Sequence, residues 1–414
     1  MARRNGGFIG TDGLDAPDPP TGVTPTAGDA SVSVAFTAPT DTGTSAITGF
    51  VATTDAGDGA TGSSSPITIS SLTNSTAYTA RVYAINAFGT SAASDASASF
   101  TPVQLQRAVF AGGSGGEVGT YTNLIDFVEI PTLGNASDFG DLTVGRHGLG
   151  GASSKTRGVF ANGQTAGSDT VTNVMDYITL GSTGNATDFG DATSAIGNTG
   201  VSGCGSDTRG LFSGGSAVRI DYITIASTGN ALDFGDMTVA SASDNRNRGS
   251  FSSTTRGIWS GGGGGNGVDH IEYVTIANTG NTTDFGNCTG IRNDTAGCSN
   301  AVRGLTFGAE NGQTLQANIE YITIASTGNG TDFGDLTGGR GRMAGAASST
   351  RALMAGGLGK DQSGNGDEFR DFIEYVTIAS TGNSQDFGNL ISGASEDFDR
   401  AKLTGVSSAH GGLA

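Results

Sequence analysis

The feature that most constrains this chain is a repeat of about 50 residues that begins at Arg107 and occurs six times. Each copy carries four landmarks in the same order: an arginine before an apolar segment, a carboxylate inside an alternating Ile-Asp-Tyr segment, a Gly-Asn pair, and a phenylalanine inside Asp-Phe-Gly. The copies begin near Arg107, Arg157, Arg209, Arg256, Arg303 and Arg351. Such a period is typical of arrays in which each unit buries its apolar face against its neighbours.

One copy is predicted to form four short strands. Val159-Phe160 is an apolar strand that ends before glycine, and Ile220 to Ile225 alternates with apolar residues on both faces, as in a strand covered on both sides. Thr-Gly-Asn predicts a tight hairpin with positive φ angles. The Gly/Ala/Ser segment predicts a fourth strand where chains crowd around an axis. Helix signals are nearly absent, so we expect an all-β protein.

Four strands at this period predict a six-bladed β-propeller over residues 104–414. The copies resemble kelch repeats: Val109-Phe-Ala-Gly-Gly stands for the double-glycine strand, and the Phe of Asp-Phe-Gly stands for the tryptophan. Arg146, Arg292 and Arg340 lie near the kelch arginine. We expect the ring to close because residues 402–409 supply the small-residue strand that the first copy lacks, which removes the edge strands.

Residues 16–103 alternate differently, in short strands between Pro/Gly/Ser/Asp turns. Pro20-Thr-Gly-Val23, the Leu72…Tyr78 spacing and the segment 83–91 resemble a fibronectin type III domain. The resemblance implies a two-sheet sandwich with a tyrosine corner, in which the Tyr78 phenol bonds to upstream backbone. Phe36 stands where the family usually has tryptophan. Such a module is normally a spacer or adhesion unit.

The first 15 residues form a polar, Gly-rich arm that carries Arg3 and Arg4 and the apolar pair Phe8 and Ile9. One interpretation is an anchoring peptide that orders on a partner, and the other is a disordered tail.

Loops that vary among the six copies are the candidate recognition surface, because binding normally resides on variable loops of a rigid frame. The candidate recognition residues in these loops are Lys360, Asp361, Asp367, Glu368, Glu310, Asn311 and Asn266.

Composition argues against several classes of function. The formal charge of −18 leaves no basic face for nucleic acid. The three cysteines, in unrelated positions, form no disulfide framework and no zinc motif. The first residues lack the apolar core of a signal peptide, and no run is long enough for a membrane span. We therefore expect a protein made in a cytoplasm, without membrane insertion.

The sequence predicts no enzyme, no cofactor and no metal. Hydrolase, zinc-protease and nucleotide-binding motifs are missing, and Asp-Phe-Gly occurs without the other kinase elements. Four Asn-x-Ser/Thr matches are interpreted as left-handed hairpin residues. A ring of carboxylates either bonds to the repeated arginines or, if it faces the axis, binds a cation; its members are Asp126, Asp176, Asp221, Glu272, Glu320 and Glu374. The sequence does not decide whether two loops converge and bring together the paired carboxylates that glycoside hydrolysis requires.

The combination of a fibronectin-like module with a Gly/Ser/Thr/Asn-rich propeller resembles structural proteins of tailed-bacteriophage virions, those of marine phages and cyanophages above all. This resemblance implies a tail- or baseplate-associated fibre or adhesin, with other virion proteins as partners of the arm and a host surface glycan or receptor as partner of the propeller. A homo-oligomer is compatible with it. The alternatives are a capsid-surface decoration or head fibre, and a bacterial secreted adhesin or carbohydrate-active enzyme.

Overall fold

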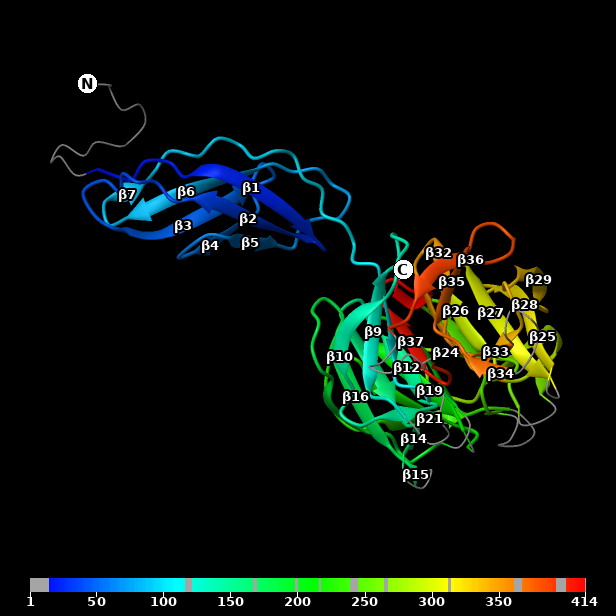
Figure 1. Cartoon of the computed structure of the whole chain (residues 1–414). Coiled ribbons are helices and arrows are strands. Elements are labelled where there is room, and N and C mark those ends of the chain that lie inside the picture. The colour runs from blue at the N-terminus through cyan, green and yellow to red at the C-terminus, as the bar shows by residue number, and fades with distance from the viewer. Residues whose placement is uncertain are drawn as a thin grey trace. The chain divides into compact units, whose positions relative to one another are not determined.

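The computed structural model describes residues 15–115, 121–166, 170–197, 200–215, 217–238, 245–263, 267–311, 314–360, 367–391 and 400–413. The chain divides into two compact units, Met1–Leu105 and Gln106–Ala414 (Figure 1). The described residues form strands, loops and short 3-10 turns such as Gly411–Leu413. None of them forms a helix long and apolar enough to cross a membrane. The expected all-β class is confirmed.

The first unit is a sandwich of two antiparallel sheets. One sheet has the order β1 (Thr21–Gly28), β2 (Ser31–Thr37), β5 (Ile67–Ser70). The other has the order β4 (Gly59–Gly62), β3 (Ile47–Thr54), β6 (Ala80–Asn86), β7 (Gly89–Thr90). Strands β2 and β6 bury every second residue, as their sequence alternation predicts. These buried side chains from both sheets form one core.

The tyrosine corner of the first unit is present. The backbone N–H of Thr73 donates to the Tyr78 hydroxyl at 3.1 Å, so the buried phenol has a partner. Phe36, at the position of the usual tryptophan, is buried and its ring lies 4.8 Å from that of Phe50.

The described part of the second unit contains six four-stranded antiparallel sheets, one for each repeat. Each sheet runs from a small-residue strand through the strand that begins with the landmark arginine and the alternating strand to the Asp-Phe-Gly strand. The first three sheets are β37 (Thr404–Ser407), β8 (Arg107–Ala111), β9 (Leu124–Glu129), β10 (Ser137–Asp141); β12 (Gly150–Ser153), β13 (Arg157–Ala161), β16 (Val174–Thr179), β17 (Thr187–Asp191); and β18 (Val201–Gly205), β19 (Arg209–Gly214), β20 (Arg219–Thr224), β21 (Leu232–Asp236).

The remaining sheets follow the same order. They are β22 (Gly249–Ser252), β23 (Arg256–Ser260), β24 (Val268–Thr275), β25 (Thr283–Arg292); β26 (Ala296–Ser299), β27 (Arg303–Asn311), β28 (Thr314–Thr323), β29 (Thr331–Asp335); and β31 (Ala344–Ala347), β32 (Arg351–Ala355), β35 (Phe372–Thr377), β36 (Gln385–Asn389). Two small sheets are β11 (Arg146–His147), β14 (Gln164–Thr165), β15 (Thr170–Val171) and β30 (Arg340–Gly341), β33 (Leu358–Lys360), β34 (Asp367–Phe369).

The first sheet joins the beginning and the end of the second unit. Strand β37 pairs with β8 from Thr404 opposite Ala111 to Ser407 opposite Ala108. This is the pairing that we expected from the small-residue segment 402–409.

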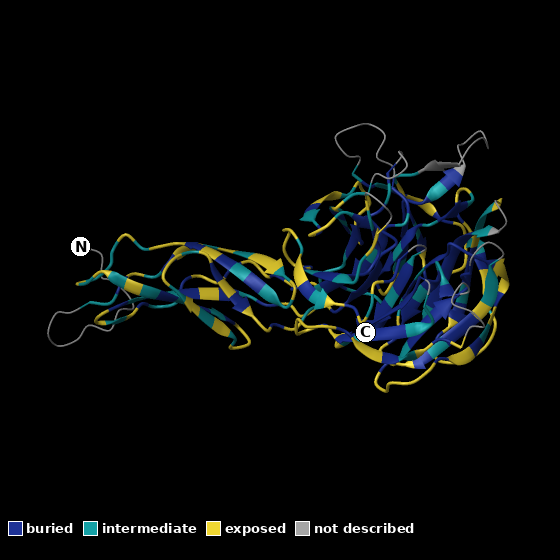
Figure 2. Cartoon of the chain, turned by 90° about the horizontal axis from the view of Figure 1, so that it is seen from below, coloured by how far each residue is buried: buried dark blue, intermediate teal, exposed yellow. Residues whose placement is uncertain are grey.

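The six small-residue strands β37, β12, β18, β22, β26 and β31, here called the inner strands, contact one another in that order, and β31 contacts β37 in turn. Glycine makes this approach possible. A Cβ atom on Gly203 would lie 2.4 Å from the Gly151 carbonyl oxygen, and one on Gly405 would lie 2.4 Å from that of Gly345. Figure 2 shows the strands inside this unit as buried and exposed segments around its outside.

Each landmark arginine connects its own sheet to the next one. The Arg157 guanidinium lies over the Tyr177 ring, 4.3 Å from its centroid, and donates to the Ile225 carbonyl oxygen at 2.9 Å. All six arginines make the equivalent bond to the next sheet, and the bond from Arg351 to the Ile130 carbonyl connects the sixth sheet to the first.

The Asp-Phe-Gly and Gly-Asn landmarks also meet between sheets. Phe189 is buried and packs edge-on against Tyr177 of its own sheet, and its carbonyl oxygen accepts the backbone N–H of Gly229 in the next sheet at 2.7 Å. Asn230 accepts the backbone N–H of Asp191 in the preceding sheet at 3.1 Å, and Gly190 leaves room for the Gly229 carbonyl. The hairpin asparagines do not have positive φ, so our left-handed interpretation of the Asn-x-Ser/Thr matches was wrong. Their side chains instead satisfy a backbone donor of the neighbouring sheet.

Candidate functional site

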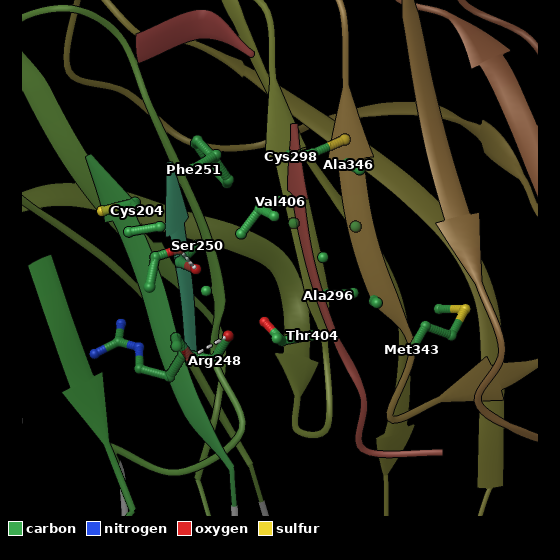
Figure 3. A pocket seen from close by; sticks show the side chains of 18 of the residues that line it. Cys204, Arg248, Ser250, Phe251, Ala296, Cys298, Met343, Ala346, Thr404 and Val406 are labelled. Atoms are coloured by element: carbon green, nitrogen blue, oxygen red, sulfur yellow. Dashed lines mark hydrogen bonds between the residues drawn. The ribbon is translucent and has the colours of Figure 1, made fainter. Parts of the chain in front are cut away.

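The inner strands surround a cavity of about 120 Å³ (Figure 3). All six contribute to its wall, which consists largely of Gly, Ala, Ser, Val and Cys residues. Thr404 and Val406 of β37 point toward the cavity, whereas the guanidinium of Arg248 points away from it. The wall is therefore of mixed polarity.

One end of the cavity is covered by the segment after β37. The His410 Nε2–H donates to the Ser153 carbonyl oxygen at 3.0 Å, and the Gly412 backbone N–H donates to His410 Nδ1 at 3.1 Å. Because Nδ1 accepts, the neutral ring has its proton on Nε2. Burial lowers the His410 pKa, while the Ser153 bond and the charge of Asp207 act in the opposite direction. We call this end the capped end.

The other end is bordered by six equivalent residues, one before each inner strand, which we call the mouth rim. They are Gly148, Gly200, Asn247, Asp294, Arg342 and Lys402. All six have left-handed backbone, with φ between 49° and 66°. Backbone bonds connect neighbours on the rim, such as the Lys402 N–H to the Arg342 carbonyl and the Gly148 N–H to the Lys402 carbonyl, both at 2.8 Å.

A left-handed backbone costs a residue with a side chain roughly 1–2 kcal/mol, less for Asn and Asp. Glycine avoids that cost, and Gly148 and Gly200 show that glycine fits this position of the repeat. A second set of equivalent positions, five residues after each landmark arginine, also has positive φ. There five of the six residues are glycine; the set is Gly112, Asn162, Gly214, Gly261, Gly308 and Gly356. The rim thus retains charged side chains where the backbone favours glycine.

Arg342 lies in an ion-paired cluster at the mouth. Its Nε is 3.0 Å from Asp294 Oδ2, and its Nη2 is 2.8 Å from Glu310 Oε2. Burial and the neighbouring Asp294 raise the pKa of Glu310, against the effect of Arg342. The Arg342 side chain remains 29% exposed, so it is accessible from the mouth.

Among the described residues of the cavity wall, the thiols and serine hydroxyls lack the features of an activated nucleophile. Burial raises the pKa of the Cys204 thiol to about 12 and raises that of Cys298 further, so both are protonated at neutral pH. Serine hydroxyls such as those of Ser250 and Ser252 donate to carbonyl oxygens of the neighbouring inner strand.

The predicted ring of carboxylates lies behind the inner strands and pairs with arginines. Asp176 is fully buried, its Oδ2 is 3.0 Å from the Arg146 guanidinium, and its Oδ1 accepts from the Thr143 hydroxyl of the preceding sheet. Four other carboxylates have the same kind of arginine partner, from just before the inner strand: Asp126 with Arg400, Glu272 with Arg248, Glu320 with Arg292 and Glu374 with Arg340.

The sixth carboxylate, Asp221, pairs with Arg219. Before its inner strand, Ile196 takes the place of Arg146, because its carbonyl oxygen accepts the Gly163 N–H as that of Arg146 accepts the Gly113 N–H. These arginines are not the landmark ones, which stack on aromatic rings. The carboxylates therefore bind arginines, as one of our two interpretations held, but the prediction that the repeated arginines are the partners was wrong. Among the described residues, no three His, Cys, Asp or Glu side chains are grouped as a metal site would require.

The sequence-predicted recognition residues have separate locations. Glu310 lies at the mouth in the Arg342 cluster. The backbone of Lys360, Asp367 and Glu368 belongs to the small sheet of β30, β33 and β34, and Asn311 ends β27. Asp361, Asn266 and the arm residues Arg3, Arg4, Phe8 and Ile9 lie outside the described residues.

Sequence reasoning missed the mouth rim. Aligning the six repeats would have shown Gly, Gly, Asn, Asp, Arg and Lys in one column, directly before the small-residue strand. Such a change of chemistry in an otherwise regular array was the available signal. The left-handed backbone was not visible in the sequence, because Arg and Lys rarely adopt it.

Comparison with known proteins identifies the first unit. Residues 18–100 match the family model of the fibronectin type III domain, and the sandwich and tyrosine corner agree with it. A search of the curated proteins found no match for the chain.

Proposed function

We propose that residues 104–414 form a six-bladed kelch-like propeller, and that the chain is a non-enzymatic structural protein of a tailed-phage virion. Its role would be that of a tail- or baseplate-associated fibre or adhesin. The fibronectin type III domain acts as a spacer, and the propeller contacts the host surface.

The cyclic order of contacts supports the propeller. Every inner strand has two inner-strand neighbours, and the bond from Arg351 to Ile130 repeats, between the sixth and first sheets, the bond that links every other pair. A closed ring satisfies all six bonds at once and leaves no sheet without a neighbour.

The difference between the two ends of the cavity carries the functional proposal. The chain enters the second unit at the capped end, where Arg107 exchanges bonds with Ser408. The mouth and the variable hairpins, β14–β15 and β33–β34 among them, lie at the opposite ends of the strands. A unit attached through its first residues thus presents its variable loops away from the attachment.

A non-enzymatic role agrees with the chemistry of the wall. Its thiols are protonated, its serine hydroxyls donate to backbone carbonyls, and the carboxylates behind it are neutralised by arginines. The virion assignment rests on resemblance to such proteins in domain combination and composition.

A glycan array read out together with released product tests this role. We expect the full chain to retain surface glycans without releasing shorter products. Catalytic turnover of any bound glycan would contradict the non-enzymatic assignment.

Deletion of residues 1–15 tests attachment. We expect the deleted chain to fold but to be lost from purified tails. Loss from heads instead would identify a capsid decoration, and unchanged incorporation would contradict an anchoring arm.

A further inference from the structure

The mouth rim suggests a ligand class for the proposed recognition function. Its four side chains stand next to one another around the ring, from Asn247 through Asp294 and Arg342 to Lys402, and Gly148 and Gly200 complete the circle. One half of the mouth therefore carries side chains with hydrogen-bonding groups. The other half, formed by Gly148 and Gly200, presents only backbone at the entrance of the cavity.

Among the described rim residues and Glu310, the formal charges balance. Asp294 and Glu310 offset Arg342 and Lys402. An anionic ligand would approach two carboxylates, and a cationic ligand would approach two cations. An apolar ligand would desolvate all four groups without bonding any of them. These three classes are therefore disfavoured.

A ligand with adjacent hydroxyl groups matches the rim. A hydroxyl both donates and accepts, whereas a carboxylate only accepts and the Arg and Lys groups only donate. One hydroxyl can donate to Asp294 while the same or the next hydroxyl accepts from Arg342 or Lys402. The Asn247 amide serves either role. The cavity of about 120 Å³ limits the part that enters to one small unit.

We propose that the mouth rim binds a neutral, hydroxyl-rich unit, such as a terminal sugar with a vicinal diol, through Asn247, Asp294, Arg342 and Lys402. The proposal rests on the function proposed above and gives it a specific site. It also explains why Arg342 and Lys402 hold a backbone conformation for which this repeat position elsewhere uses glycine.

Glycine substitutions test the site with little risk to the fold, because Gly148 and Gly200 already occupy equivalent positions. Asn247→Gly, Lys402→Gly and Arg342→Gly should each weaken binding of neutral methyl glycosides at least tenfold, measured by saturation-transfer NMR on the full chain. Lys155→Gly, in the turn after β12 at the capped end, is the matched control and should bind as the unchanged chain does. Methyl uronates and amino sugars serve as charged probes and should bind more weakly than the neutral glycosides.

The outcomes separate the two proposals. The rim site is overturned if neutral glycosides do not bind the unchanged chain. It is also overturned if they bind all three rim variants as tightly as they bind the unchanged chain. If the same variants also keep their glycan-array binding, recognition occurs on the loops and the adhesin role stands. If the unchanged chain binds neither glycosides nor array glycans, both proposals fail. Because Arg342 also forms ion pairs, a loss of binding only in the Arg342 variant, with a lowered melting temperature, would assign it a structural role and overturn the site.

Discussion

The spaces between the sheets and the mouth of the cavity are built from the same repeat but differ in regularity. Between sheets, the landmark arginine, the hairpin asparagine and the carbonyl oxygen of the buried Phe form the same contacts six times. At the mouth, six equivalent positions carry five residue types. The difference indicates where each repeat is restricted by packing against its neighbours and where it is free to acquire a separate chemistry.

The largest effect is expected from the regular region. Asp176→Ala leaves the fully buried Arg146 guanidinium without its carboxylate, which should lower the free energy of unfolding by about 3–5 kcal/mol. Chemical denaturation measures the loss. The double variant Arg146→Met/Asp176→Leu should lose less than the single one, since no charge stays buried; an equal or larger loss would show that the pair itself stabilises the unit.

A smaller loss is expected where inner strands meet. Gly203→Ala places a Cβ atom 2.4 Å from the Gly151 carbonyl oxygen, so the strands must separate, at a cost of about 1–3 kcal/mol. Gly181→Ala is the control, because its Cβ would meet nothing within 4 Å. Equal melting temperatures for the two variants would contradict close packing at the inner strands.

The capped end should respond weakly to pH. Because the His410 pKa is lowered in the folded protein, the unfolded chain binds the proton more readily, so stability is fully present above about pH 6.5 and declines as the pH falls below it. Protonation of Nδ1 also removes the acceptor of the Gly412 N–H. The difference in stability between the unchanged chain and His410→Gln, measured at pH 7.5 and pH 5, should shrink at the lower pH; a constant difference would argue against this role of His410.

The smallest effect on stability belongs to the mouth. Lys402→Gly removes the cost of a left-handed backbone at a residue with a side chain, which stabilises the folded state. It also gives the unfolded chain more conformational freedom, which opposes that gain. The free energy of unfolding should therefore change by less than about 0.5 kcal/mol in denaturation. A large loss would mean that Lys402 stabilises the second unit, and the contrast between mouth and interior would disappear.

Much of the architecture could be predicted from the sequence because it repeats. The four strands of each copy and the strand that completes the first sheet follow from residue patterns, and the tyrosine corner of Tyr78 follows from the resemblance to fibronectin type III domains. The partners of the carboxylates were harder to predict, since Arg248 and Arg219 occupy other positions than Arg146 does in their repeats. The mouth rim was not predicted, because a sequence period shows which positions of the repeats are equivalent but carries no information on whether their backbone is left-handed.

The pairing of β37 with β8 also has a consequence in time. Arg107 and Ser408 are 301 residues apart, yet they bond to each other in one sheet. Synthesis proceeds at about 5–20 residues per second, so β37 is made some tens of seconds after β8. Until then the edge of β8 is available to strands from other nascent chains, so the yield of this protein should depend on translation speed and on chaperones that cover that edge.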